Sequence, residues 1–274
     1  MSNEIQKTDG KKEMTFSAYI TASGMKNKIN QIIGDEKNGS RFISSIISAV
    51  STNPALAECE NSSIVSGALL GEALKLSPSP QLGLYYLVPF NLKGRGMVAQ
   101  FQLGYKGYIQ LAIRSGQYKK LNVIAIKEGE LIKYDPLNEE LEVKLIDDEL
   151  KREKAKTIGY YAMFEYTNGF RKSMYWSKEK MEKHALQYSR GYQAKKGSTF
   201  WERDFDSMAY KTMLRQLISK WGIMSIDMQN AYESDMAVIH EDGSKEYVDN
   251  TPTSVDDEIF EAAYEEAKSL DDVE

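Results

Sequence analysis

Apolar side chains in the N-terminal part of the chain recur at the spacing of helices. From Phe16 to Ile33 they return every three or four positions and stop at Gly34, so we predict a helix over this range. Ser40 and Asn61, which are residue types that cap helices, precede two further runs of the same period. The sequence therefore predicts a group of N-terminal helices.

The period changes to that of strands between Leu84 and Trp176. Asn168-Gly169 separates the last two strand-like runs, and this dipeptide favours a tight hairpin because both residues accept positive φ. We therefore predict an antiparallel sheet. Its strands are expected at residues 85–90, 97–103, 121–127, 158–166 and 170–176.

Helical patterns return between and after these strands. One runs from Gly104 to Ser115, another begins after Ser177, and the longest extends from Trp201 to Trp221 and ends at Gly222. Helices and an antiparallel sheet in one chain predict the α+β fold class.

The last part of the chain has a different character. Beyond Tyr232 the apolar period is lost until a short amphipathic run at 259–267. We expect a flexible N-terminus over 1–13, a folded core over 14–232, and over 233–274 an acidic, largely flexible linker with a short helical segment that binds a partner.

The net charge of −5 hides an uneven distribution. Residues 90–222 contain 25 Lys and Arg against 16 Asp and Glu, whereas residues 233–274 contain 2 against 15. A basic body attracts phosphate backbones, and an acidic tail discourages unspecific association or recruits a partner.

Composition argues against several kinds of site. Cys59 is the single cysteine and the chain has two histidines, so we expect neither an internal disulfide nor a zinc site. We find no phosphate-binding loop of the form GxxxxGK[ST], and no run of about 18 to 20 apolar residues that could cross a membrane. We therefore expect a cytoplasmic protein without catalytic residues, cofactor, metal or membrane contact.

Residues 99–118 interleave aromatic rings, amides and cations. On a helix, Lys106, Gln110 and Arg114 form one polar stripe, because residues four apart share a face. Such a stripe can bind a polyanion while the opposite face packs. The alternative is an ordinary surface helix with a solvated stripe.

Two further segments carry cations, one beside aromatic rings and one on a single helix face. Residues 187–201 mix three cations with aromatic rings, and bases stack on such rings at about 1 to 3 kcal/mol each. The alternative is a loop whose rings anchor it to the core. In the longest helix, Lys211 and Arg215 share a face and predict a second cationic stripe. We expect nucleic-acid contacts from Lys93, Arg95, Gln102, Tyr105, Lys106, Arg114, Lys119, Arg171, Lys172, Arg190, Tyr192, Lys195, Trp201, Lys211 and Arg215.

Three segments, YYLVPF at 85–90, AQFQLGYKGYIQLAIRSGQY at 99–118 and LISKWGIMSIDMQ at 217–229, carry a family resemblance. They resemble the RecT family of phage and prophage single-strand annealing proteins, and the resemblance covers roughly residues 42–232. It implies an ATP-independent recombination protein that holds DNA in a basic groove, anneals complementary strands and forms rings or helical filaments. It also implies a core of antiparallel strands crossed by a long helix.

The same resemblance implies single-stranded DNA and the annealed duplex as ligands, copies of the chain as partners, and a companion exonuclease or the host single-strand-binding protein as a partner of the tail. Two other classes stay open. Acidic pairs at 139–140 and 147–148 suit a magnesium-dependent nuclease, although we expect them in a hydrophilic loop. A phage scaffold or adaptor protein would oligomerise without nucleic acid.

Overall fold

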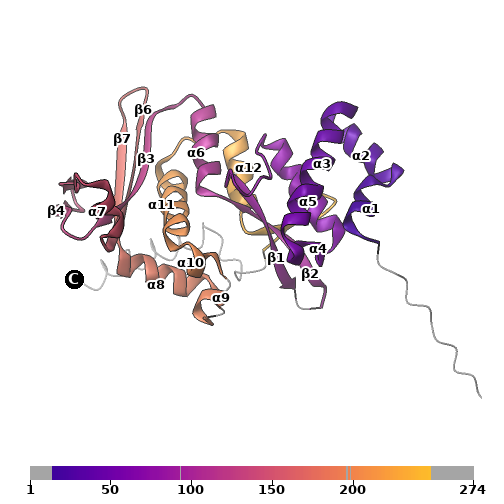
Figure 1. The fold of residues 1–274 in the computed structure, drawn as a ribbon. Coiled ribbons are helices and arrows are strands. Elements are labelled where there is room, and N and C mark those ends of the chain that lie inside the picture. The colour runs from indigo at the N-terminus through magenta and orange to yellow at the C-terminus, as the bar shows by residue number, and fades with distance from the viewer. Residues whose placement is uncertain (1–13, 93, 196, 198, 248–274) are drawn as a thin grey trace, which may run out of the picture.

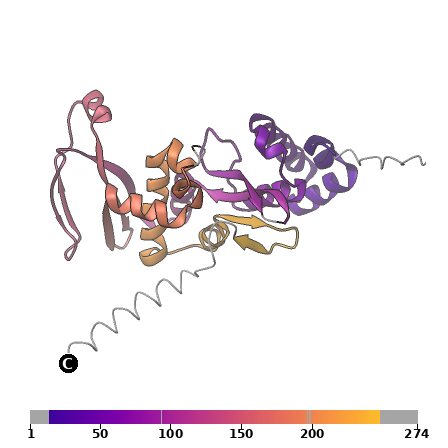
Figure 2. The same ribbon diagram turned by 90° about the horizontal axis from the view of Figure 1, so that it is seen from below.

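A computed structural model describes residues 14–92, 94–195, 197 and 199–247. The predicted α+β class is confirmed, because helices are combined with sheets whose strands pair antiparallel. The molecule is elongated, with the N-terminal helices at one end and a three-stranded sheet at the other (Figures 1 and 2). A second sheet and several helices lie between these ends.

The N-terminal helices surround buried apolar residues. The helix predicted over 16–33 is interrupted at Ala22, whose extended backbone separates two helices, and Gly34 ends the second of them at φ +95°. The next helix begins before Ser40, because the side chain of Asp35 accepts the capping hydrogen bond from a backbone N–H at 2.7 Å. These helices are α1 (Phe16–Thr21), α2 (Ser23–Ile33), α3 (Glu36–Thr52), α4 (Pro54–Ala57) and α5 (Asn61–Ala73).

The middle of the molecule contains a four-stranded sheet in the order β1-β2-β8-β9. β1 (Tyr85–Leu92) and β2 (Gly96–Leu103), both predicted as strands, form a hairpin. β8 (Ala237–Ile239) pairs with β2, and β9 (Lys245–Tyr247) pairs with β8. The sheet therefore joins strands from both halves of the chain.

β8 lies in the segment 233–274, which the sequence assigns to an acidic linker, yet all three of its residues are buried. Three apolar residues within an acidic run are too few to show a period, so the sequence pattern alone does not predict this strand. Packing against the core thus continues to residue 247. The flexible segment expected at 1–13 and the short helix expected at 259–267 lie outside the described residues.

Three strands form the sheet at the other end of the molecule: β3 (Tyr118–Lys127), β6 (Thr157–Tyr166) and β7 (Arg171–Ser177). The long helix α11 (Phe205–Trp221) packs on this sheet, as the family resemblance implies. The hairpin predicted at Asn168-Gly169 joins β6 to β7, with Gly169 at φ +87°. Its turn projects at the upper left of Figure 1.

The remaining helices connect and cover the two sheets. The helix predicted over 201–221 is divided at Asp204, whose side chain caps α11 by accepting from a backbone N–H at 3.1 Å. Ser177 caps the helix that follows β7, as predicted. The elements are α6 (Tyr105–Arg114), α8 (Lys178–Tyr188), α9 (Arg190–Gln193), α10 (Phe200–Arg203) and α12 (Ile226–Ser234).

The acidic pairs at 139–140 and 147–148, which we expected in a loop, lie in a segment that contains the hairpin of β4 (Leu131–Asp135) and β5 (Glu140–Val143) and leads into α7 (Glu149–Lys154). The carboxylate of Glu130, fully buried, accepts a hydrogen bond from Arg152 at 2.6 Å and fixes the base of this hairpin. Residues 128–149 carry nine Asp and Glu against two Lys. We call them the acidic arm.

Candidate nucleic-acid interface

Lys119, Arg171 and Lys172 are the predicted site residues that the structure brings together. β3 begins, β6 ends and β7 begins at the same tip of the three-stranded sheet, where Glu165 pairs in register with both Lys120 and Arg171. The last turn of α11 reaches this tip as well. We define the tip cluster as Lys119, Lys120, Phe170, Arg171, Lys172, Lys220 and Trp221.

Five cations of the tip cluster face few anions. A register shift between Tyr118 and Lys120 lets two consecutive lysines reach Glu165, with N–O distances of 2.6 Å from Lys119 and 3.5 Å from Lys120. The hydrogen bond from Lys119 lowers the pKa of Glu165, so this carboxylate stays ionised. Glu165 and Glu139, which forms an ion pair with Lys172, neutralise two of the five charges, and the other three leave the tip electropositive.

Two aromatic rings accompany the cations. The ammonium of Lys172 lies 3.7 Å from the centroid of the Trp221 ring, and that of Lys220 lies 5.8 Å from it. Trp221 is 44% exposed and Phe170 is 45% exposed, so both rings are accessible. Exposed rings beside cations are the combination with which proteins bind single-stranded nucleic acid, because bases stack on the rings and phosphates contact the cations.

Hydrogen bonds connect the tip of the sheet to the segment that follows α11. The hydroxyl of Tyr118 donates to the carbonyl oxygen of Ile223 at 3.2 Å, and the N–H of Ile223 donates to the hydroxyl of Tyr166.

The cations of the tip cluster do not all lie on one face. Because successive strand residues point to opposite faces, the side chains of Arg171 and Lys172 extend from opposite faces of the sheet. The tip cluster therefore surrounds the end of the sheet and does not by itself line one trough.

Lys211 and Arg215 lie elsewhere and are not the exposed stripe that their spacing predicts. Lys211 is only 6% exposed, and its ammonium contacts the carboxylate of buried Asp235 at 2.8 Å. Arg215 contacts the same carboxylate at 3.0 Å and lies over the ring of Tyr232. Burial lowers the pKa of Lys211. Asp235 belongs to the stretch expected to be a linker, so the sequence offered no partner for these cations.

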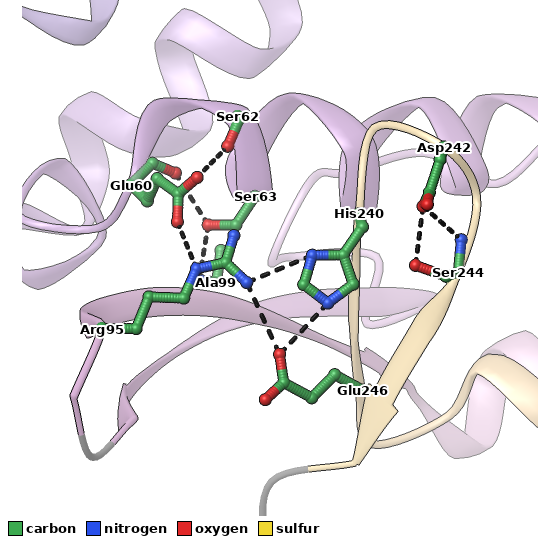
Figure 3. Close-up of polar contacts among 9 residues, drawn as sticks. All are labelled: Glu60, Ser62, Ser63, Arg95, Ala99, His240, Asp242, Ser244 and Glu246. Atoms are coloured by element: carbon green, nitrogen blue, oxygen red, sulfur yellow. Dashed lines mark hydrogen bonds and ion pairs between the residues drawn. The ribbon is translucent and has the colours of Figure 1, made fainter.

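Arg95 bridges three elements (Figure 3). Its guanidinium donates to Glu60, the residue before α5, at 2.7 Å, and contacts His240 at 3.1 Å and Glu246 at 3.5 Å. These contacts connect the turn of the β1–β2 hairpin to the hairpin of β8 and β9. Lys93, expected beside Arg95 at the interface, lies outside the described residues.

The rings expected in a loop over 187–201 are mostly packed. Trp201 is 7% exposed, and its ring centroid lies 6.2 Å from that of Tyr192, so the alternative of rings that anchor the segment fits these two residues. Arg190 and Lys195 are exposed on the same segment. Gln102 is 8% exposed, and its amide donates to a neighbouring glutamine side chain on β2 at 2.6 Å.

The polar stripe predicted on α6 is present. Lys106, Gln110 and Arg114 are exposed, while the opposite side of the helix is buried. Arg114 also donates to a backbone carbonyl that follows α5, at 2.6 Å. The ring of Tyr105 packs edge-on against a tyrosine of α11 at 5.5 Å. α6 thus carries cations on the surface, and its C-terminal end leads into β3 and the tip cluster.

Sequence reasoning left Lys120, Phe170, Lys220 and Trp221 out of the site. The adjacency of Lys220 to Trp221, and of Phe170 to two cations, was the signal that could have found them. Among the described residues, no three or more His, Cys, Asp or Glu side chains converge as a metal site would require. The described helices also include none with the length and apolar character of a membrane span.

Comparisons with known proteins agree with the resemblance noted in the sequence. The model of the RecT family matches residues 40–250. The chain is 40% identical over 248 residues to the protein YqaK of Bacillus subtilis (strain 168), which covers 90% of this chain and 79% of YqaK. It is 28% identical over 241 residues to Protein RecT of Escherichia coli (strain K12), covering 85% of this chain and 86% of RecT.

Proposed function

Because the chain belongs to the RecT family of recombination and single-strand annealing proteins, we propose that it binds single-stranded DNA and anneals complementary strands without ATP. Two phosphate backbones repel one another, and bound cations offset this repulsion. Base pairing itself then supplies the free energy of annealing.

The tip cluster is the surface that carries this proposal. Five cations and two accessible rings from β3, β7 and α11 meet at one end of the three-stranded sheet. The cations can follow the phosphates, and Phe170 and Trp221 can stack with bases of any sequence. Such contacts are strong and sequence-tolerant, as annealing of arbitrary strands requires.

The polar stripe of α6 extends the same surface. Arg114 is separated from Lys119 by a short turn, so DNA that leaves the tip can continue along Gln110 to Lys106. Arg190 and Lys195 are exposed and are proposed as peripheral contacts. The sequence-predicted contacts Lys211 and Arg215 instead hold α11 to the turn between α12 and β8 through Asp235, and we assign them a positioning role.

One chain presents cations around a tip, whereas annealing needs room for two strands. We propose that neighbouring copies, arranged as a ring or a helical filament, complete the groove between their tips. For the tail beyond residue 247 we propose a protein partner, either a companion exonuclease or the host single-strand-binding protein. A pull-down of each candidate with the full chain and with a chain ending at 247 distinguishes them.

A triple variant tests the tip cluster. Lys119→Ala, Lys120→Ala and Arg171→Ala remove three exposed cations, and Lys28→Ala, Lys37→Ala and Arg41→Ala remove three exposed cations from α2 and α3 as a matched control. Losing three phosphate contacts should reduce the slope of log affinity against log salt by about 2 and weaken binding about 100-fold near 100 mM salt. Fluorescence anisotropy with a labelled oligonucleotide measures both quantities.

The control variant should retain the slope of the unmodified protein. A tip variant that also retains it would remove the tip cluster from the interface. Annealing is measured by adding the labelled complement and separating duplex from single strands on a native gel. Strand length is measured on a denaturing gel after incubation with magnesium. Intact strands support an annealing protein, and shortened strands would point to the nuclease alternative.

A further inference from the structure

The turn of the acidic arm lies against the tip cluster. Glu139, in this turn, forms an ion pair with Lys172 of β7. The carbonyl oxygen of Glu139 also accepts a hydrogen bond from the hydroxyl of Ser173 at 3.0 Å. Beyond it, the ring of Tyr134 packs on that of Tyr175 with centroids 5.0 Å apart. Three contacts therefore hold the arm along the edge of β7.

The side chain of Lys172 is consequently enclosed between an anion and a ring. Its ammonium pairs with the Glu139 carboxylate and lies 3.7 Å from the centroid of Trp221, and the side chain is 18% exposed. Trp221 itself remains 44% exposed. An ammonium next to an accessible flat ring matches one phosphate and one adjacent base of a single strand.

We propose that Lys172 and Trp221 form a nucleotide subsite for single-stranded DNA, and that Glu139 occupies its phosphate position in the free protein. The inference rests on the proposed function and deepens it. A carboxylate and a phosphate oxygen make the same charge-assisted hydrogen bond to an ammonium, so one can replace the other. DNA binding then moves Lys172 from Glu139 to the strand, while the base stacks on Trp221.

The distribution of charge supports this exchange. Within residues 90–222, the acidic arm holds nine of the 16 acidic residues but two of the 25 cations. The most acidic segment of this region thus places its turn beside the five cations of the tip cluster. A polyanion that binds several cations at once can displace Glu139, whereas a small anion that gains a single contact competes poorly. The arm therefore favours strands over isolated phosphates.

Two neighbouring glutamates provide a matched test. Glu139→Gln removes the carboxylate on Lys172, and Glu140→Gln removes the same charge from the adjacent exposed residue, the first of β5. Without Glu139, binding a phosphate to Lys172 releases a counterion, so the salt slope should steepen by about 0.7 and affinity for oligothymidine should rise about 5-fold near 100 mM salt. Glu140→Gln should change affinity less than about 2-fold, because it acts only through screened, long-range repulsion.

A second variant guards against effects on the turn. Glu139 has φ +57°, and Glu139→Asn removes its carboxylate from Lys172 while favouring that backbone conformation. It should tighten binding as Glu139→Gln does. Equal salt slopes for the Glu139 and Glu140 variants, in a protein that binds oligothymidine, would overturn the subsite. A parent protein that fails to bind oligothymidine would instead overturn the proposed function.

The stacking half of the subsite has its own readout. An abasic oligonucleotide of equal length carries the same phosphates without bases, so the ratio of the two affinities isolates stacking. Trp221→Leu should reduce the preference for oligothymidine over the abasic strand by about 5-fold or more, since one stacked base contributes at least about 1 kcal/mol. The salt slope should stay unchanged in this variant. An unaltered preference would exclude Trp221 from the subsite.

Discussion

Asp235 joins the long helix to the four-stranded sheet, and its replacement by Asn should be strongly destabilising. The carboxylate is 1% exposed and accepts hydrogen bonds from Lys211 at 2.8 Å, from Arg215 at 3.0 Å and from the N–H of Leu103 at 2.9 Å. Asp235→Asn keeps the shape of the side chain and the bond to Leu103. It removes the charge that compensates two cations.

The cost falls mainly on Lys211, which is 6% exposed and cannot turn toward water without opening the core. Removing one partner of a buried ion pair costs about 3 to 5 kcal/mol. This cost cannot exceed about 5 kcal/mol near neutral pH, because the buried lysine can instead lose its proton. Deprotonating a lysine costs about 1.4 kcal/mol for each unit by which its ordinary pKa exceeds the pH. Arg215 keeps its contacts with the Tyr108 hydroxyl and the Tyr232 carbonyl. We therefore expect a loss of about 3 kcal/mol in the free energy of unfolding.

Urea unfolding followed by circular dichroism measures this loss. With a slope of about 3 kcal/mol per molar urea, the midpoint should fall by about 1 M. Asp147→Asn, at an exposed position of the acidic arm, is the control and should leave the midpoint in place. Adding Lys211→Met to Asp235→Asn should recover part of the loss, because it removes the unpaired charge. A loss below about 1 kcal/mol for Asp235→Asn would refute the reasoning.

Three further predictions follow from the packing. A chain ending at residue 247 should keep the thermal midpoint of the full chain, whereas one ending at 232 loses β8 and Asp235 and should melt at least about 10 °C lower. Equal midpoints for the two truncated chains would show that residues 233–247 do not stabilise the core. Burial lowers the pKa of His184 to about 4 from 6.5, so on acidification the unfolded chain binds this proton first and the folded state loses stability. Between about pH 7 and pH 5 the parent should lose about 2 kcal/mol more stability than His184→Phe, measured by urea unfolding at both pH values. An equal loss in both proteins would contradict this prediction. Arg95→Ala should cost about 1 kcal/mol through its lost ion pairs and leave the salt slope of DNA binding unchanged; a slope reduced by about 0.7 would return Arg95 to the interface.

Elements with a clear local signal were predictable from the sequence. The β6–β7 hairpin follows from strand-like runs around Asn168-Gly169, and α6 follows from apolar spacing after Gly104. Each of these signals lies within a few residues of the element it determines. The same is true of the cap at Ser177.

Features that depend on distant partners were not predictable. Lys211 shares a helix face with Arg215 and looks solvated until Asp235 is placed beside it. The tip cluster combines β3, β7 and α11, segments about fifty residues apart in the chain, so no spacing pattern reveals it. The acidic arm showed its charge but not its turn, and therefore not the contact of Glu139 with Lys172.

The central claim is that the tip of the three-stranded sheet holds the single strand. Photocrosslinking with an oligonucleotide of 5-iodouridine, followed by mass spectrometry of the crosslinked peptides, tests it most directly because this base reacts with the aromatic side chains on which it stacks. Crosslinks should concentrate on Phe170 and Trp221 and disappear when unlabelled oligothymidine is added in excess. Crosslinks confined to the N-terminal helices or to residues 188–201 would contradict the account.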